Sequence, residues 1–354
     1  MAKVFIRSFY PFPTGSSVPP TGIKLVESAR HWARFETLLK QCLSDLGHEI
    51  TQQTDPPKAA DEPHDASIRI YAHKNRRDVD GDLFYKQMHI PELFTVDHLG
   101  WGADHSGMQA SPDLSDIDPA QAESFIRSLK NRLLETGISK LSQPARGELS
   151  SLPDDYIFAP TQTPRDYVQV HHSPIPVASF VHLIAQWAEA ARQNVVFKLH
   201  PGLYHTSESD RQVIDAVARY AAACSRVFCV NANVHDLISR ARGVFTINSG
   251  VGFESLIHGK PVVTFGDCDY KWVTFAADGL SLDEARKYVL EYGEQRRPQV
   301  DRFIYHYFFR HAYSIEDAAD SSPRQRLTEY LARRLGRDFN QSASDMNRLA
   351  SIGR

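Results

Sequence analysis

The feature that most constrains the fold is a regular alternation of short apolar runs and amphipathic stretches between Tyr156 and Phe265. Five runs of four or five mostly apolar residues predict buried strands, at 156–160, 195–199, 227–230, 243–247 and 261–265. Stretches with helical periodicity lie between them, over 177–192, 209–223, 234–242 and 252–258. Strands that alternate with helices are typical of a parallel, doubly wound sheet, so this part of the chain is expected to form an α/β domain.

The first 150 residues carry a weaker pattern. Helical periodicity over 23–46 and 122–141, with a strand-like run over 67–72, indicates a second, less regular α/β domain. Residues 51–66 are polar and contain three prolines, which predicts a loop.

The expected domain organisation follows from these patterns. Residues 1–150 form the first domain, with 142–153 read as the linker, and 151–320 form the second. Residues 321–354 are expected to hold a terminal helix and a tail. The stretch 324–337 is basic and amphipathic, which favours a helix docked on the protein. Its density of arginines leaves a peripheral contact with the inner membrane as the alternative.

Composition narrows the class of protein. A net charge of −3 over 354 residues gives no electrostatic footprint for nucleic acid. Four widely spaced cysteines without CxxC spacing favour reduced thiols over a zinc site or a disulfide framework. The N-terminus lacks the apolar core of a signal peptide, and no apolar run reaches the length of a bilayer span. We therefore expect a soluble cytoplasmic protein.

Polar loops follow every strand of the predicted parallel sheet. Gln162 and Asp166 follow the first strand, His200 follows the second, and Asn248 follows the fourth. The carboxyl ends of parallel strands meet at one edge of the sheet, where ligands bind in such folds. We expect these side chains to converge there.

The loop after the fourth strand reads Asn248-Ser-Gly-Val-Gly-Phe-Glu254. Asn248 or Ser249 is placed to cap the next helix, while Gly250 and Gly252 let the backbone approach a ligand. Free amides and the helix dipole favour a phosphate at such a helix start, and Glu254 is placed to accept hydrogen bonds from a ribose or a base. The alternative is a plain turn with a cap. The loop lacks the third glycine of the dinucleotide-binding motif.

Two further groups are candidates for chemistry. In Lys198-Leu-His-Pro201, the ammonium offers a point charge, the imidazole of His200 binds or protonates a phosphate, and the proline fixes the chain direction. Asp166 is the leading carboxylate for a nucleophile or a base.

A Gly-rich segment over 94–107 contains His98, Asp104 and His105, which are expected to present an acceptor or a second catalytic group. With Asp97 these residues would also suit a metal ion, but they lack the spacing of common metal motifs, so no metal is expected.

The order of these motifs over 155–275 resembles the capsular polysaccharide synthesis and export proteins. Characterised members of that family are β-Kdo glycosyltransferases that use CMP-Kdo. The motifs that carry the resemblance are, in order, Gln162…Asp166, Lys198-Leu-His-Pro201, Val234-His-Asp-Leu-Ile238, Asn248 to Glu254, and His258-Gly-Lys-Pro-Val262 with Phe265-Gly266. The His-Pro and serine motifs are also similar to those of bacterial GT-B sialyltransferases.

The resemblance implies a GT-B arrangement of two Rossmann-like domains that face a cleft, with the donor nucleotide on the C-terminal domain. It implies that His200 and Ser249 contact the CMP phosphate and that Glu254 binds the nucleoside. Asp166 would be the catalytic carboxylate, supported by Gln162. Expected partners are a CMP-sugar donor and a glycan or glycolipid acceptor, with no cofactor and no nucleic acid.

Other functions stay open at this point. They are a sialyltransferase, a CDP-polyol phosphotransferase, a nucleotide-sugar epimerase, or a non-catalytic partner in capsule export. The loop Gly266-Asp-Cys-Asp-Tyr270 carries two acids close to the expected donor site, which leaves the identity of the donor sugar open.

Overall fold

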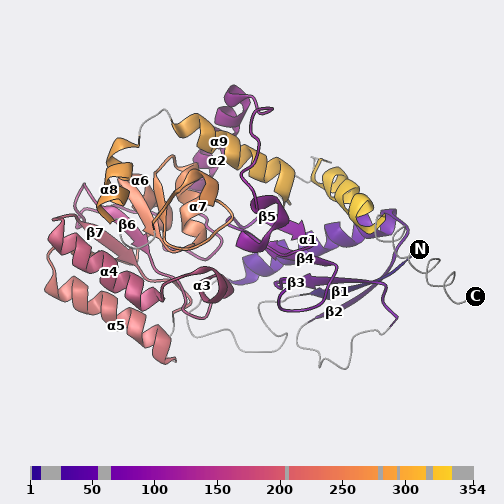
Figure 1. The fold of residues 1–354 in the computed structure, drawn as a ribbon, viewed down its shortest axis with the longest axis horizontal. Helices are drawn as coiled ribbons and strands as arrows, with labels where there is room; N and C mark the ends of the chain where they lie inside the picture. Colours follow the sequence, from indigo (N-terminus) through magenta and orange to yellow (C-terminus); the bar gives the residue numbers. More distant parts are fainter. Residues whose placement is uncertain are drawn as a thin grey trace, which may run out of the picture. The chain divides into compact units, whose positions relative to one another are not determined.

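The computed structural model describes residues 2–8, 25–54, 65–203, 207–277, 282–292, 296–315 and 322–336 (Figure 1). The chain forms two compact units that are discontinuous in sequence. Unit 1 comprises Met1–Gln87, Glu92–Trp101 and Ala312–Arg354, and unit 2 comprises Met88–Pro91 and Gly102–His311.

Unit 2 contains a six-stranded sheet in which every strand pair is parallel. Its spatial order is β11-β10-β9-β6-β7-β8. The strands are β6 (Ile157–Pro160), β7 (Val195–Lys198), β8 (Val227–Cys229), β9 (Gly243–Thr246), β10 (Val262–Thr264) and β11 (Phe275–Ala276). Because β6 lies between β9 and β7, the order of the strands reverses at β6, and the loops that follow β6 and β9 flank this switch point.

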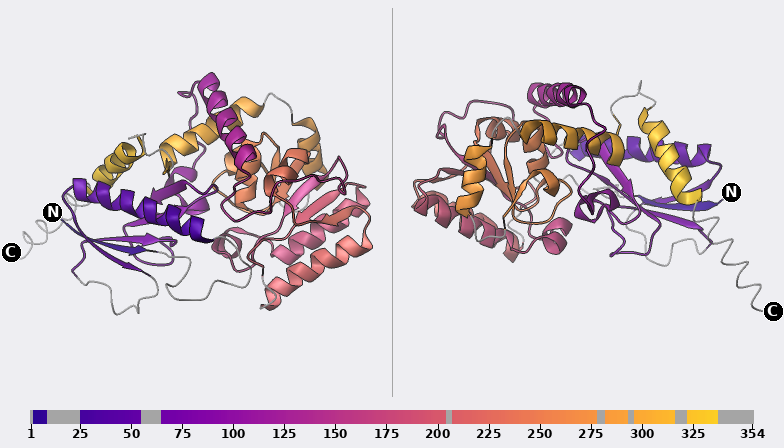
Figure 2. Two further views of the ribbon diagram at one scale, coloured as in Figure 1. Left: turned by 180° about the vertical axis from the view of Figure 1, so that it is seen from behind. Right: turned by 45° about the horizontal axis from the view of Figure 1, so that its top comes forward.

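Helices cover both faces of this sheet. Helices α4 (Val177–Ala190), α5 (Glu208–Ala223) and α8 (Leu282–Glu291) supply a hydrophobic cluster with side chains from β6, β7, β9 and β10. Helices α4 and α5 run side by side along that face (Figures 1 and 2). Helix α7 (Gly250–Ile257) contacts β9 and β10 but adds nothing to that cluster, so it covers the opposite face, as right-handed crossovers require.

The remaining helices of unit 2 are α2 (Pro119–Thr136), α3 (Tyr167–His172), α6 (Val234–Arg240) and α9 (Arg297–His306). Helix α2 packs against α9 and α7. Its own end is well defined, because Gly137 adopts the left-handed conformation, with φ of 63°, and closes the last turn onto Leu133.

Unit 1 contains a mixed six-stranded sheet of order β12-β5-β4-β3-β1-β2. Its strands are β1 (Lys3–Ser8), β2 (Glu49–Thr54), β3 (Ile68–Ala72), β4 (Leu83–Gln87), β5 (Leu93–Asp97) and β12 (Ala312–Ser314). Strands β1 to β4 pair in parallel, whereas β5 is antiparallel to both β4 and β12. Helix α1 (Leu25–Asp45) and a helix over 322–336 share one hydrophobic cluster with this sheet (Figure 2).

The expected α/β fold class with two Rossmann-like units is confirmed. All five strands and all four helices predicted between 156 and 265 are present, with ends that shift by one or two residues. The predicted terminal helix is present over 322–336, and it is docked on unit 1 through Leu327, Leu331 and Leu335. The tail beyond 336 lies outside the described residues.

The chain divides at other places than the boundaries expected from the sequence. Residues 102–150 belong to unit 2 rather than to the first domain, and residues 312–336 return to unit 1, where β12 pairs with β5. The expected helix over 122–141 ends at Thr136, because Gly137 terminates it. The expected loop at 51–66 is wrong over 51–54, which belong to β2 and pair with β1, and residues 55–64 lie outside the described part.

In the part of the chain that the structure describes, no helix combines the length and the apolar character needed to cross a membrane.

Candidate active site

Two loops at the switch point of the unit 2 sheet are joined by a buried pair of amide side chains. The Gln162 side chain donates to Asn248 Oδ1 over 2.8 Å, and the Asn248 backbone N–H donates to Gln162 Oε1 over 3.1 Å. Both side chains are buried. This reciprocal pair fixes the loop after β6 against the loop after β9, where ligands bind in open parallel sheets.

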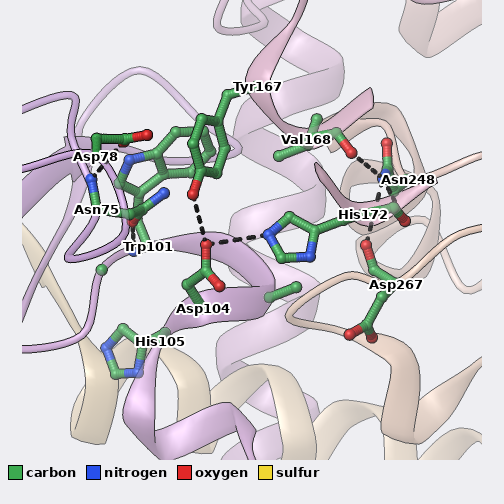
Figure 3. A network of polar contacts seen from close by, with 12 residues as sticks. Asn75, Asp78, Trp101, Asp104, His105, Tyr167, Val168, His172, Asn248 and Asp267 are labelled. Carbon is green, nitrogen blue, oxygen red and sulfur yellow. Dashed lines mark hydrogen bonds and ion pairs between the residues drawn. The ribbon is translucent and has the colours of Figure 1, made fainter. Parts of the chain in front are cut away.

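The same asparagine also holds helix α3 (Figure 3). Asn248 Nδ2 donates to the Val168 carbonyl over 2.9 Å, and it lies 3.3 Å from the carbonyls of His172 and Asp267. At the other side of α3, Asp104 Oδ2 accepts hydrogen bonds from the Tyr167 hydroxyl and from His172 Nε2, over 2.9 and 3.0 Å. Helix α3 is therefore held in place from both sides.

Asp166 stands at the first position of α3 as its N-cap residue. Its carboxylate makes no capping hydrogen bond, and it forms no hydrogen bond or ion pair with any residue that the structure describes. The residue is partly buried. A carboxylate that is positioned but unpaired is available for a reacting atom.

His200 follows β7 and is held by its neighbours in one orientation. Its backbone N–H donates to Thr161 Oγ1 over 2.9 Å, and its ring Nδ1 accepts from the Gly202 N–H over 2.9 Å. Burial lowers the pKa of His200 to about 4, and the nearby cations Lys140 and Lys198 add to this effect, while Asp166 opposes it. The ring is neutral at pH 7 with its proton on Nε2, and it acts as a hydrogen-bond donor.

Lys198 and Pro201 have different surroundings. The Lys198 ammonium is buried and donates to the Ala232 carbonyl over 2.8 Å and to Asn231 Oδ1 over 3.3 Å, so it is directed to the loop after β8. Burial lowers its pKa to about 8. Pro201 lies partly exposed in the turn between His200 and Gly202.

The start of α7 combines a cap with two glycines of different roles. Ser249 is the N-cap residue, and its hydroxyl accepts from the Val251 N–H over 3.3 Å. A Cβ at Gly252 would overlap the Tyr270 hydroxyl, which donates to the Ser249 carbonyl over 2.5 Å. Gly252 is therefore needed for packing against Tyr270, whereas Gly250 is partly exposed at the helix start.

Glu254 lies one turn into α7 and is 1% exposed. The Ser139 side chain hydrogen-bonds to its carboxyl group, but Glu254 Oε1 has no partner among the described residues. Burial raises the pKa of Glu254 to about 8, an effect that Ser139 and the nearby Lys140 reduce only in part. The carboxyl group is therefore mostly protonated at pH 7.

Two residues near this edge, Lys140 and His89, are absent from the sequence-based candidates. Lys140, from the segment after α2, lies within electrostatic range of the carboxylates of Asp166, Asp269 and Glu254. His89 Nε2 donates to Asp269 Oδ2 over 2.9 Å, and its ring stacks on Phe253 of α7 with centroids 4.3 Å apart. No motif signals them, because they come from segments distant in sequence.

The expected acceptor-side residues belong to two different units. His98 belongs to unit 1, where its Nδ1 lies 3.6 Å from Asp97 Oδ2, whereas Asp104 and His105 belong to unit 2. Asp104 fixes α3, and His105 Nδ1 accepts from the Gly107 N–H over 3.0 Å. Among the described residues, no three acidic, histidine or cysteine side chains are grouped as metal ligands would be.

Comparison with known proteins identifies the family. A family model described as "Capsule polysaccharide biosynthesis protein" matches residues 105–314. The chain belongs to the capsule polysaccharide biosynthesis family. The matched region covers most of unit 2 and includes all the candidate residues of this site except His98 and Asp104.

Several individual proteins of the comparison are similar to this chain. "Protein FixF" of Sinorhizobium fredii is 33% identical over 141 residues, which are 39% of this chain and 33% of FixF. The chain thus matches about a third of the length of that relative. The structure described as "Thermosulfurimonas dismutans KpsC, beta Kdo 2,7 transferase" is 14% identical and has a TM-score of 0.48, covering 93% of this chain and 99% of its own. The KpsC beta Kdo 2,4 transferase of the same organism is 17% identical with a TM-score of 0.42, over 74% and 79% of the two chains.

Proposed function

We propose that this member of the capsule polysaccharide biosynthesis family is a glycosyltransferase that takes an acidic sugar, Kdo, from a CMP-activated donor. The acceptor is a surface polysaccharide or a glycolipid. Unit 2 binds the donor at the carboxyl edge of its parallel sheet. The proposal requires no metal ion and no cofactor.

The observation that carries this proposal is a group of unpaired functional groups at the switch point of the sheet. Among the described residues, the Asp166 carboxylate forms no hydrogen bond or ion pair, the Nε2–H of His200 has no acceptor, and the buried Glu254 Oε1 has no hydrogen-bond donor. Buried polar groups in folded proteins are normally hydrogen-bonded, so the buried, unpaired Glu254 Oε1 fits a site that a polar ligand completes, and the partly buried Asp166 and His200 lie at the same edge of the sheet. Family membership supports a sugar substrate.

Each side chain has a defined task in this reaction. The neutral His200 donates from Nε2 to the donor phosphate, together with the amides at the start of α7. The protonated Glu254 both donates to and accepts from the hydroxyls of the nucleoside. These contacts stabilise the phosphate as the bond between it and the anomeric carbon breaks and its oxygen takes the bonding electrons.

Asp166 acts on the sugar or on the acceptor. If configuration is retained, its carboxylate attacks the anomeric carbon and forms a glycosyl-enzyme adduct, which the acceptor hydroxyl then displaces. If configuration is inverted, the carboxylate takes the proton of the acceptor hydroxyl as that oxygen attacks. In both cases the role requires a carboxylate without a permanent partner, as at Asp166.

The donor is tested by thermal shift with CMP, UMP, UDP, CDP and GDP. CMP is expected to stabilise the protein most, because ligands that bind the folded state raise its melting temperature. Stabilisation by UDP without an effect of CMP would overturn the CMP donor.

Catalysis is tested with Asp166→Asn, which is expected to lower the transfer rate at least 10³-fold while CMP binding stays within about 2-fold. Asp155→Asn at the opposite end of β6 is the matched control, with an expected activity close to that of the wild type. If Asp166→Asn retains full transfer, Asp166 is not the catalytic carboxylate. If the wild type transfers no sugar and Asp166→Asn still supports capsule assembly, the chain is a non-catalytic partner.

A further inference from the structure

The segment that follows α2 is held by the first turn of α6, although the sequence suggested a linker in this region. Asn233 Nδ2 donates to the carbonyls of Gly137 and Pro144, each over 3.0 Å. His235 Nε2 donates to the Ile138 carbonyl over 2.8 Å. Both side chains are buried, so residues 137–144 have a fixed path along unit 2.

Further contacts extend this attachment to residue 147. Asp236 accepts from Arg146 Nε over 2.7 Å and from the Gly147 N–H over 3.0 Å. Val234 N–H donates to Gln143 Oε1 over 3.3 Å. We call residues 137–147 the clasped segment. The residues of the clasped segment and their partners in and just before α6 are about ninety positions apart in sequence. Each contact uses a polar group that would be hydrated by water in a disordered linker.

The clasped segment carries Ser139 and Lys140 to the carboxyl edge of the sheet. Ser139 hydrogen-bonds to Glu254 of α7, and the preceding Ile138 is fixed by His235. Lys140 therefore has an anchored neighbour on its N-terminal side. Its ammonium lies within electrostatic range of Asp166, Asp269 and Glu254 from three different elements of unit 2.

Lys140 nevertheless has no partner among the described residues. It makes no hydrogen bond, and no carboxylate oxygen lies within the 4.0 Å of an ion pair. Asp269 is engaged by His89 and by the Tyr307 hydroxyl, which donates over 2.6 Å. The Lys140 ammonium thus lies within electrostatic range of Asp166 and Glu254, and it also acts on the imidazole of His200.

The charges at this edge favour an anion next to Lys140. Burial raises the pKa of Glu254, so that carboxyl group carries little charge at pH 7, and the carboxylate of Asp269 accepts hydrogen bonds from His89 and Tyr307. Lys198, the cation expected from the sequence, is occupied by the loop after β8. Lys140 is partly buried, and loss of solvent lowers its pKa, so an anionic ligand group beside it stabilises the charged ammonium.

We propose that Lys140 binds the phosphate of the donor nucleotide and balances its charge when the phosphate leaves, a role that rests on the proposed function. The phosphate lies between the ammonium of Lys140, the Nε2–H of His200 and the start of α7. The clasped segment is thereby part of the donor site, and Lys140 takes the electrostatic place that a metal ion holds in many enzymes that use nucleotide sugars.

The test compares a nucleotide with its nucleoside in the full chain. Affinities for CMP and cytidine are measured by calorimetry for the wild type, Lys140→Met and Lys130→Met. Lys130 is the matched control, since it is partly buried in unit 2 and donates to the His258 carbonyl over 3.2 Å. Lys140→Met is expected to weaken CMP binding about 10- to 100-fold and to change cytidine binding less than about 2-fold. Lys130→Met is expected to leave both affinities unchanged.

Chemical rescue separates a lost charge from a damaged fold. Propylamine is expected to restore part of the CMP affinity of Lys140→Ala, because the free amine occupies the vacated position. Unchanged CMP binding by Lys140→Met, or equal losses for CMP and cytidine without rescue, would overturn the role of Lys140 while the proposed function stands. If the wild type binds neither CMP nor UMP, the proposed function fails, and the role of Lys140 fails with it.

Discussion

Glu254 shows how strongly the fold changes the chemistry of a single residue. In the sequence it is an ordinary acid near a helix start, where a negative charge would complement the helix dipole. In the part of the chain that the structure describes, Glu254 is buried in α7 with Ser139 as its side-chain hydrogen-bond partner, and burial raises its pKa to about 8. A protonated carboxyl group can donate as well as accept, which suits the vicinal hydroxyls of a ribose.

This pKa predicts a dependence of stability on pH. The folded pKa lies above the unfolded value of 4.5, so the folded state binds the extra proton between pH 4.5 and 8. The contribution of Glu254 to the free energy of unfolding is complete below pH 4.5. Above that pH it falls by about 1.4 kcal/mol per pH unit until pH 8. Between pH 6 and pH 8, Glu254→Gln should therefore gain about 2 kcal/mol of unfolding free energy relative to the wild type.

Urea unfolding at the two pH values measures this difference. The exposed Glu284 of α8 provides the control, since Glu284→Gln is expected to follow the wild type at both pH values. If the unfolding free energies of Glu254→Gln and the wild type change equally between pH 6 and pH 8, Glu254 is charged in the folded protein at pH 6.

The position of part of the candidate site at one edge of the sheet was predictable from the sequence. Asp166, His200, Asn248 and Glu254 each follow a strand of a parallel sheet, and strand order alone brings such positions to one edge. Lys140 was not predictable, because it fell in the expected helix over 122–141, whereas its place depends on side-chain contacts between α6 and the segment that follows Gly137. The role of Gly252 was also hidden, since its partner Tyr270 approaches from another loop.

Among the secondary-structure elements, helix α6 fixes the clasped segment through the residues of its first turn and its N-cap. Asn233 caps it, with its Oδ1 accepting from the His235 N–H over 2.9 Å, while its Nδ2 holds the clasped segment. These two tasks use different atoms of one side chain. They can therefore be separated by a substitution that preserves the cap.

Asn233→Asp keeps the capping oxygen and removes both donors to the clasped segment. We expect faster amide hydrogen exchange over 137–147, a loss of about 1–3 kcal/mol in stability, and weaker CMP binding, because Lys140 loses its fixed position. Asn194→Asp is the control, since its Nδ2 donates to the Asp155 carbonyl, away from the segment. Unchanged exchange over 137–147 would mean that the contacts of His235 and Asp236 suffice.

The elements between 156 and 265 were predicted well because both faces of their sheet are covered. A strand buried on both faces becomes a continuous apolar run, and β6, β7 and β9 are buried at every residue. Unit 1 gave weaker signals. Its strand β2 has the polar sequence Glu49–Thr54 and lies at the sheet edge beside β1, so hydrophobic pattern alone could not identify it.

For the whole molecule, the two units have separate hydrophobic clusters. Leu331, fully buried in the helix over 322–336, belongs to the cluster of unit 1. Leu331→Ala is expected to lower the stability of unit 1 by about 2–5 kcal/mol and to leave the CMP affinity of unit 2 within about 2-fold.

Tryptophan fluorescence distinguishes the two units during unfolding. Trp32 and Trp101 lie in unit 1, and Trp187 and Trp272 lie in unit 2. Leu331→Ala should shift the transition of the first pair, whereas Val213→Ala in α5 should shift that of the second. Equal shifts of both pairs in both variants would show that the units unfold as one.

The discontinuity of unit 1 has a consequence for synthesis on the ribosome. Residues 98–311 separate β5 from its antiparallel partner β12. At typical elongation rates, translating them takes on the order of 10 to 40 s. All six strands of unit 2 emerge in that interval. During this time the edge of β5 that later pairs with β12 has unpaired backbone N–H and C=O groups, to which another chain can pair. The nascent protein therefore has its greatest need of chaperones before Ala312 is made.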